Sequence, residues 1–271
     1  MKIAAIQFPP VFGNDEKNLE RLAPLLEKAK YADLVVLPEL ANSGYHFCDK
    51  NEAFQLSEIP ENSAFVAFLI NFCRKNNSAI VTGFNERHGL KIYNSALLMD
   101  KTGIIGKYRK IHLFMDEKEY FEPGNLMPRP FEVNGVKVGL LVCFDWMFPE
   151  IYRNLAMQGA DIICQPSNLV LPGKAQKAIP VHAMINRVFV VLANRTGTER
   201  NLTFTGNSLI VGPDGEIIAQ ASSSEEEVLK ADVDISLSKN KMITPKNHAF
   251  GDRRPEFYGT LTVNTNFEKL S

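Results

Sequence analysis

The order of its predicted elements makes this chain an α/β protein. Apolar strand-like runs alternate with amphipathic helix-like runs along most of the 271 residues. No long polar linker interrupts the series, which closes with a predicted hairpin. This alternation predicts a layered α/β domain. Periodicity alone does not distinguish a doubly wound sheet from two packed sheets.

The first half of the chain supplies four predicted strands and two predicted helices. The expected elements are a strand at 2–8, a helix at 18–32, a strand at 33–39, a helix at 62–76, and strands at 78–86 and 93–100. Asn62 or Ser63 can cap the second helix, because such side-chain oxygens accept an N–H of the first turn. A turn containing His88 and Gly89 joins the last two strands.

The second half continues in the same way. We expect a strand at 137–145, a helix at 149–159, a strand at 161–168, a helix at 174–187, a strand at 188–195, and a hairpin of 207–212 with 216–221 around a Pro-Asp-Gly turn. The linker-like material is a charged turn at 221–227 and the tail after Pro245. We therefore expect one domain over 1–271, with a C-terminal arm from about residue 245.

Composition excludes several classes of function. The chain is 45% hydrophobic and 23% charged, with a net charge of −1, so no overall field attracts nucleic acid or an anionic membrane. No run approaches the about 18 apolar residues of a membrane span, and the N-terminal apolar run is too short for a signal peptide, so we expect a cytoplasmic protein. Cys48, Cys73, Cys143 and Cys164 form no CxxC pair, which argues against a zinc site or a disulfide framework.

Cys143 is the strongest candidate nucleophile. It ends an apolar run at 138–142, and Pro149 and Glu150 follow as residues suited to the first turn of a helix. A thiol at such a strand-to-helix corner has its pKa lowered by the helix dipole and by unpaired N–H groups. The alternative is a buried structural cysteine, because free cysteine is among the most buried residue types.

Glu39 is a candidate general base. It ends the apolar strand at 33–39, and an ionised carboxylate there costs several kcal/mol unless it is paired or its pKa rises. That environment suits a group that accepts a proton. The alternative is a glutamate at a strand end that points into water.

Three cations crowd the strand-like run at 107–114. One of Lys107, Arg109 and Lys110 beside Glu39 and Cys143 would favour the thiolate and stabilise negative charge on a substrate oxygen. The others then read as solvated charges on an edge strand, which suits Lys107 and Arg109.

These three segments, in this order, resemble the motifs of the nitrilase superfamily of carbon-nitrogen hydrolases. The resemblance extends from AAIQF near the N-terminus to DRRPEFY near the C-terminus. It implies that Glu39 is the general base, Lys110 the family's lysine and Cys143 the nucleophile. A second family glutamate aligns best with Glu117.

Glu119 and Glu122 compete with Glu117 for that last role, and both also read as charges on a loop surface. The resemblance further implies a four-layer αββα sandwich, in which two mixed sheets pack face to face with helices outside. It implies a homodimer, or a higher homo-oligomer, joined through helices beside the active site. The C-terminal arm is expected to pack on the partner subunit, and no metal or organic cofactor is required.

The implied reaction is hydrolysis of a small amide to the acid and ammonia. Cys143 would form a thioester while Lys110 and the backbone N–H of Phe144 hold the oxyanion. Nitrile hydrolysis uses the same residues and is the alternative. A different class also stays open: a redox-sensing or thiol-peroxidase-like protein, against which no second cysteine is placed to resolve a sulfenic acid.

Three further residues are expected to bind substrate. Phe144 and Trp146 follow the cysteine directly, and Asn168 follows the end of the next strand. Family members that grip a substrate carboxylate often carry arginine shortly after the cysteine, where this chain has Trp146 and Met147. This departure favours a neutral or apolar acyl group.

Overall fold

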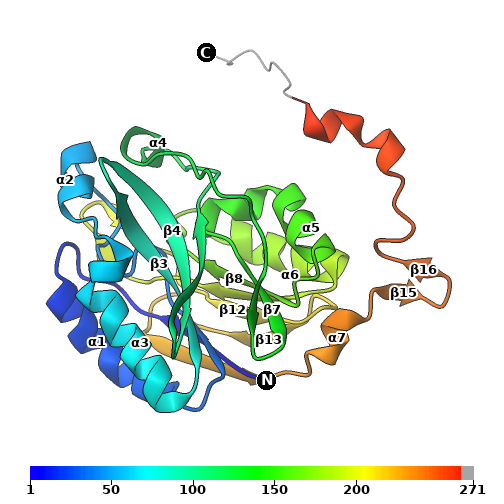
Figure 1. Ribbon diagram of the computed structural model, residues 1–271, viewed down its shortest axis with the longest axis horizontal. Coiled ribbons are helices and arrows are strands. Elements are labelled where there is room, and N and C mark those ends of the chain that lie inside the picture. The colour runs from blue at the N-terminus through cyan, green and yellow to red at the C-terminus, as the bar shows by residue number, and fades with distance from the viewer. Residues whose placement is uncertain (264–271) are drawn as a thin grey trace.

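Two six-stranded sheets form the centre of the computed structural model, which describes residues 1–263 (Figure 1). The first sheet has the order β14 (Glu227–Asp232), β1 (Lys2–Gln7), β2 (Leu34–Val36), β3 (Ala79–His88), β4 (Lys91–Asp100) and β5 (Gly103–Arg109). The second has the order β13 (Ile217–Gln220), β12 (Leu209–Val211), β9 (Phe189–Ala193), β8 (Ile162–Pro166), β7 (Val136–Leu140) and β6 (Phe131–Val133). Both sheets are mixed, because each has a parallel centre and antiparallel flanks.

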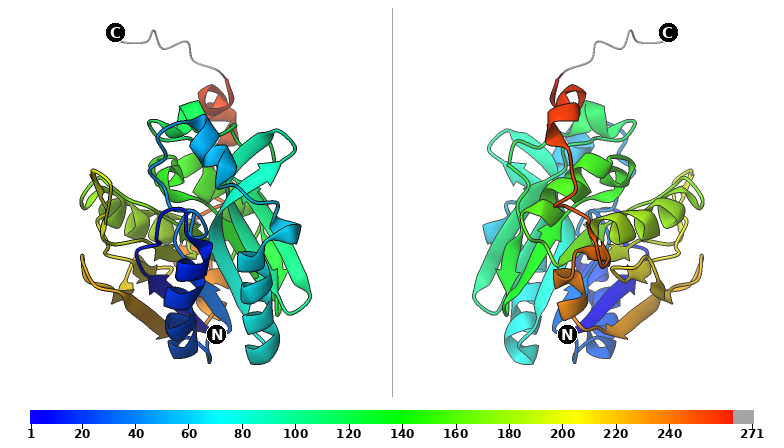
Figure 2. Two further views of the ribbon diagram at one scale, coloured as in Figure 1. Left: turned by 90° about the vertical axis from the view of Figure 1, so that its left-hand side faces the viewer. Right: turned by 90° about the vertical axis from the view of Figure 1, so that its right-hand side faces the viewer.

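Four longer helices cover the outer faces of the two sheets (Figures 1 and 2). The first sheet carries α1 (Asp15–Lys28) and α3 (Ala64–Asn76), and the second carries α5 (Pro149–Met157) and α6 (Lys174–Asn186). Ser63 caps α3 by accepting the N–H of Val66.

Strand alternation explains the layers. In β1, Ala4 and Ile6 pack with α1 and α3, whereas Ile3 and Ala5 face the second sheet. The predicted four-layer αββα sandwich is therefore confirmed.

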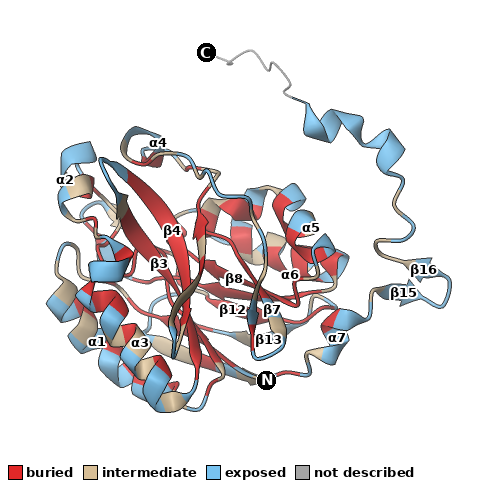
Figure 3. Cartoon of the chain, viewed as in Figure 1, coloured by how far each residue is buried: buried red, intermediate tan, exposed pale blue. Residues whose placement is uncertain are grey.

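The remaining elements are short. They are α2 (Lys50–Gln55), α4 (Glu117–Tyr120), α7 (Ser236–Lys239), β10 (Thr198–Glu199), β11 (Leu202–Thr203), β15 (Met242–Thr244), β16 (Asn247–His248) and four single 3₁₀ turns at Pro60–Asn62, Cys143–Met147, Pro255–Phe257 and Gly259–Thr262. Beyond α7 the chain leaves the body as an exposed arm (Figures 1 and 3). None of the helices in residues 1–263 is both long enough and apolar enough to span a bilayer.

The structure differs from the expected elements at three places. The charged turn expected at 221–227 is followed by a strand that was not expected, β14, which pairs antiparallel with β1 and completes the first sheet. The strand-like run at 107–114 ends at Arg109, because β5 stops there and Lys110 begins a loop. The strand expected at 137–145 ends at Leu140, and Cys143 starts a 3₁₀ turn before the helix that begins, as expected, at Pro149.

Candidate active site

Glu39 lies in a loop just beyond β2, and this loop packs directly on β3. The N–H of Gly83 donates to the Pro38 carbonyl over 3.0 Å, and the N–H of Ala41 donates to the Gly83 carbonyl over 3.1 Å. A Cβ at position 83 would lie 2.3 Å from the Cα of Glu39. Only glycine therefore lets the loop that carries Glu39, here called the acid loop, approach β3 this closely.

The carboxylate of Glu39 is fully buried, and its two oxygens are used differently. Oε1 accepts from Lys110 Nζ at 2.8 Å and from Asn94 Nδ2 at 2.7 Å. Oε2 has no hydrogen-bond partner among residues 1–263. One oxygen is thus fixed by donors while the other is free to accept a proton.

Lys110 lies between two buried carboxylates. Its Nζ donates to Glu39 and, over 2.7 Å, to Oε1 of Glu117, and its backbone N–H donates to the Asn94 carbonyl. Burial alone would lower the pKa of Lys110, but Glu117 and Glu39 raise it above its ordinary value. The site therefore contains a permanent, water-excluded cation.

Glu117 begins α4 and accepts three hydrogen bonds. Oε1 accepts from Lys110 and from the Tyr45 hydroxyl at 2.9 Å, and Oε2 accepts from the Phe114 N–H at 3.1 Å. Burial raises the pKa of Glu117 to about 7, with a further increase from Glu39 and an opposing effect from Lys110. Of the three glutamates weighed from the sequence, Glu117 is the one that contacts the lysine; Glu122 instead faces Lys50 and Lys91 at the surface.

Cys143 occupies a left-handed backbone conformation, with φ of +42°, at the start of its 3₁₀ turn. This conformation is unfavourable for a residue with a side chain, so the surrounding structure must hold it. Gln165 contributes to this by donating from Nε2 to the Cys143 carbonyl over 2.7 Å. This strained turn places Cys143 where it lines a narrow cleft.

Asp145 holds the same turn from the inside. Its fully buried carboxylate accepts from the Val142 N–H at 2.8 Å and from the Tyr108 hydroxyl at 2.9 Å. Its other oxygen lies 2.7 Å from Nδ1 of His112, whose ring stacks on Phe148. Asp145 therefore acts as a structural acceptor for the turn that carries the nucleophile.

The expected direction of the Cys143 pKa is wrong. Burial raises the pKa of the thiol well above its ordinary value, and Glu39 adds to the increase, while Lys110 and the Asn168 N–H lower it. The short 3₁₀ turn supplies less dipole than the expected α-helix, and desolvation outweighs it. The resting group is a thiol, so attack requires a base to take its proton.

Arg109 is also misjudged as a solvated charge. It is buried and binds Glu86 through two nitrogens, at 3.0 and 2.7 Å, while its guanidinium lies over Tyr93. Lys107 binds the same carboxylate at 2.8 Å and is partly exposed. Neither cation reaches the Glu39–Lys110 pair, which leaves Lys110 as the cation of the site.

A narrow cleft gives access to Cys143. Phe144, Trp146 and Asn168 all line it, with Phe114, Leu169, Val170 and Leu171. The centre of a water molecule can occupy only about 10 Å³ of the cleft, which is room for about one water. Asn168 Nδ2 donates to the Glu39 carbonyl over 3.0 Å, so this side chain ties the acid loop to the second sheet. Most of the side chains that line the cleft are apolar.

Tyr45 and Asn94 reach the site but were not expected from the sequence. Tyr45 lies six residues after Glu39 on a loop, and Asn94 lies within β4. The one signal that the sequence offers for Asn94 is that it is a polar residue next to an apolar strand-like run. In the part of the chain that the structure describes, no three His, Cys, Asp or Glu side chains are grouped to bind a metal ion.

Comparison with known proteins identifies the relatives of this chain. The family described as "Carbon-nitrogen hydrolase" matches residues 2–240. A "Nitrilase" of Pyrococcus abyssi is 45% identical, over 95% of this chain and 99% of that protein. An "N-carbamoylputrescine amidase" of Arabidopsis thaliana is 32% identical, over 86% of this chain and 85% of that protein.

Solved structures show the same likeness. A carbon-nitrogen hydrolase from Helicobacter pylori has a TM-score of 0.87 and 31% identity, covering 96% of this chain and 98% of that one. An amidase from Nesterenkonia has a TM-score of 0.82 and 26% identity, covering 96% of each chain. The latter structure is of a glutamate-to-glutamine mutant of that amidase, and it shows covalent addition of the acetamide moiety of fluoroacetamide at the active site cysteine.

Proposed function

Because the chain belongs to the carbon-nitrogen hydrolase family, we propose that it hydrolyses a small amide to the carboxylic acid and ammonia. The observation that carries this proposal is the arrangement of Glu39, Lys110 and Glu117 around the Cys143 thiol. It provides a base with one free oxygen, a fixed cation and a nucleophile in one desolvated space.

The reaction follows from these groups. Glu39 takes the thiol proton as the Cys143 sulfur bonds to the amide carbon, and Lys110 with the Phe144 N–H stabilises the resulting oxyanion. The C–N bond then breaks, Glu39 returns the proton to the leaving nitrogen, and a thioester remains on Cys143. Glu39 next removes a proton from water, whose oxygen attacks the thioester. The acid leaves as the sulfur regains a proton.

We propose a small, uncharged acyl group. The side chains that line the cleft beside Cys143 are Phe114, Phe144 and Trp146, with three aliphatic residues and Asn168. None of these residues can pair with a substrate carboxylate, and a desolvated, unpaired carboxylate would cost several kcal/mol. Trp146 occupies the region where carboxylate-binding family members often carry arginine.

Nitrile hydrolysis is the second candidate. The relative from Pyrococcus abyssi, at 45% identity, is named a nitrilase. The same thiol can add to a nitrile carbon, and Lys110 can hold the developing negative charge on nitrogen. The two reactions require the same residues and differ in the substrate accepted.

A substrate panel tests both candidates. Release of ammonia and acid is measured for aliphatic and aromatic amides, for the matching nitriles, and for amides that also carry a carboxylate group. We expect turnover of uncharged amides, and faster turnover of the nitriles would favour the second candidate. In a Glu39→Gln background, fluoroacetamide should add covalently to the protein, and no adduct should form when Cys143 is also replaced by alanine, as measured by intact mass. Activity retained in Cys143→Ala would reject both.

We also propose a homodimer formed through α5 and α6. Val181, Met184 and Ile185 of α6 and Met157 of α5 are large apolar side chains that are exposed on the single chain. A second copy would remove this surface from water. Light scattering of the wild type should give twice the mass of one chain. The Val181→Glu variant should give the mass of a single chain. A monomeric wild-type protein would refute the dimer.

We propose the cytoplasm as the location. Cys48, Cys73, Cys143 and Cys164 are all free thiols, and the nucleophile must stay reduced to act. Cell fractionation with a tagged full-length chain tests this. Recovery in an extracytoplasmic fraction would contradict it.

A further inference from the structure

Tyr45 joins the candidate active site to a buried ion pair on its far side. We propose that Tyr45 is a positioning residue that fixes Glu117 through its hydroxyl, so that Glu117 holds the Lys110 ammonium where the oxyanion forms. This inference rests on the proposed function and adds a residue to it. It assigns a task to a loop that supplies no reacting atom.

The hydroxyl of Tyr45 binds the same oxygen of Glu117 that Lys110 binds. Tyr45 Oη lies 2.9 Å from Oε1 of Glu117, the same oxygen that accepts from Lys110 at 2.7 Å. The third donor, the Phe114 N–H, binds the other oxygen. Without Tyr45, the Glu117 carboxylate would keep two donors in place of three, and Lys110 alone would restrain Oε1.

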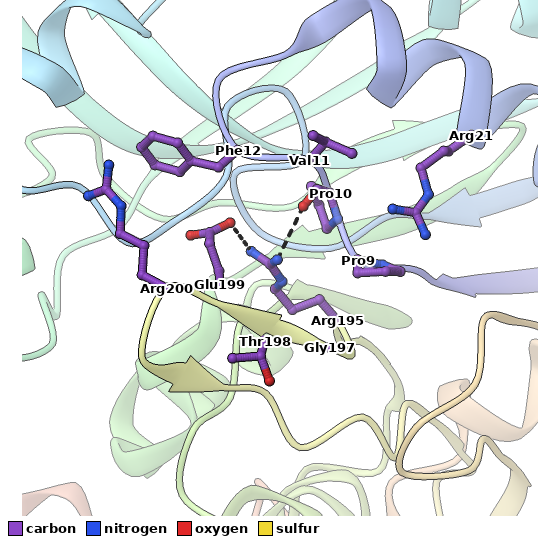
Figure 4. Close-up of a pocket in the computed structure, with 10 residues that line it drawn as sticks. All are labelled: Pro9, Pro10, Val11, Phe12, Arg21, Arg195, Gly197, Thr198, Glu199 and Arg200. Atoms are coloured by element: carbon purple, nitrogen blue, oxygen red, sulfur yellow. Dashed lines mark hydrogen bonds and ion pairs between the residues drawn. The ribbon is translucent and has the colours of Figure 1, made fainter.

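The backbone of Tyr45 is held in place by Glu199. The N–H groups of Tyr45 and His46 both donate to Oε1 of Glu199, at 2.8 and 2.5 Å. Oε2 of Glu199 accepts from Arg195 Nη1 at 2.8 Å, and Arg195 Nη2 donates to the Pro10 carbonyl at 3.2 Å. Figure 4 shows this ion pair among the residues that line a pocket. These residues come from two segments, 9–21 and 195–200.

Close packing leaves this contact no freedom. A Cβ at Gly44, whose φ is +84°, would lie 2.8 Å from Oε2 of Glu199. The Tyr45 ring meets Phe204 edge-on, with centroids 5.9 Å apart, and the Arg195 guanidinium lies over the same Phe204 ring. A buried ion pair contributes little net stability but fixes one geometry. Here that geometry is the direction of the Tyr45 hydroxyl.

Electrostatics keeps the hydroxyl a donor. Burial raises the pKa of Tyr45 well above its ordinary value, and Glu117 and Glu39 raise it further, so the hydroxyl keeps its proton. A donated hydrogen bond stabilises the ionised form of Glu117. Removing the donor must therefore move the ionisation of Glu117 to higher pH.

Tyr45→Phe removes the hydroxyl and keeps the ring. With the panel amide that the wild type hydrolyses fastest, we expect kcat to fall about tenfold or more and KM to change less than about threefold, because the lost interaction supports the transition state. The acidic limb of the kcat/KM profile should move to higher pH. In a Glu117→Gln background, the same substitution should cost less than about threefold.

Tyr120→Phe is the matched control. The Tyr120 hydroxyl donates to the Phe47 carbonyl at 3.1 Å, so its removal deletes a comparable hydrogen bond without touching Glu117. This variant should keep wild-type kcat and the wild-type acidic limb. Thermal unfolding of all variants separates misfolding from mispositioning.

Two results overturn the inference. One is Tyr45→Phe with unchanged kcat and an unchanged acidic limb. The other is an equal loss in the wild-type and Glu117→Gln backgrounds, which would mean that Tyr45 acts elsewhere. A wild type that hydrolyses no member of the panel would refute the proposed function and this inference with it. Activity that depends on Cys143 but not on Tyr45 refutes the inference alone.

Discussion

Replacing Lys110 with methionine tests whether the buried ammonium is the centre of the site. Methionine fills similar volume but removes the charge that Glu39 and Glu117 share. All three side chains are almost completely buried, so the two carboxylates would face each other without a cation or water. Both catalysis and stability should then fall.

The size of each effect follows from the contacts. Loss of one oxyanion donor lowers kcat by about 10²–10³-fold. Loss of one partner from a buried ion pair costs about 3–5 kcal/mol, which corresponds to a decrease of roughly 10 °C in melting temperature for a chain of this size. The stability loss should shrink as pH falls from 7.5 to 5.5. Without the cation, which lowers the pKa of Glu117, that pKa rises further above its ordinary value, so the folded variant binds more protons than the unfolded chain and gains stability at lower pH.

Lys107→Met is the matched control. Lys107 also binds a buried carboxylate, Glu86, at 2.8 Å, but Glu86 keeps two hydrogen bonds from Arg109. This variant should keep wild-type kcat and lose at most about 1 kcal/mol. Ammonia release and thermal unfolding at the two pH values complete the assay. A Lys110→Met protein that keeps more than a tenth of wild-type kcat, or unfolds at the wild-type temperature, would refute the reasoning.

Three more predictions follow from single contacts. Glu39→Gln should abolish measurable ammonia release, because the amide cannot take the thiol proton. The melting temperature should stay within a few degrees, because the amide keeps one acceptor for Lys110. Substantial turnover would exclude Glu39 as the base. The kcat/KM of the wild type should rise with pH through an acidic limb near 7, where Glu117 ionises, and Glu117→Gln should remove that limb; a limb that persists must belong to another group. Gly83→Ala should reduce both activity and melting temperature, because its Cβ would lie 2.3 Å from the Cα of Glu39, whereas Gly89→Ala, with open space around its Cβ, should leave kcat unchanged; equal kcat in the two variants would contradict the close approach.

The chain order of strands and helices could be predicted wherever one face of the element is apolar. This holds for β1 and α3, and it also placed Glu39 and Cys143, because each follows a buried apolar run. It failed for β14, whose residues are mostly half-exposed because the strand forms the edge of its sheet. An edge strand without a continuous apolar run gives no such signal in the sequence.

Partners that meet only through tertiary packing could not be predicted from the sequence. Asn94 and Tyr45 reach Glu39 and Glu117 across 55 and 72 residues of chain, and no local pattern encodes such contacts. The Cys143 pKa was misjudged for the same reason. The dipole of a following helix is a local property, whereas desolvation of the thiol depends on which distant segments cover it.

The hydrogen bond from Asn168 to the Glu39 carbonyl crosses from one sheet to the other. The base and the lysine extend from loops of the first sheet, while the sulfur belongs to the second. Neither half alone can assemble the chemistry. During refolding, activity should consequently return only when the two sheets pack together. The recovery of ammonia release therefore reports the time course of this last folding step.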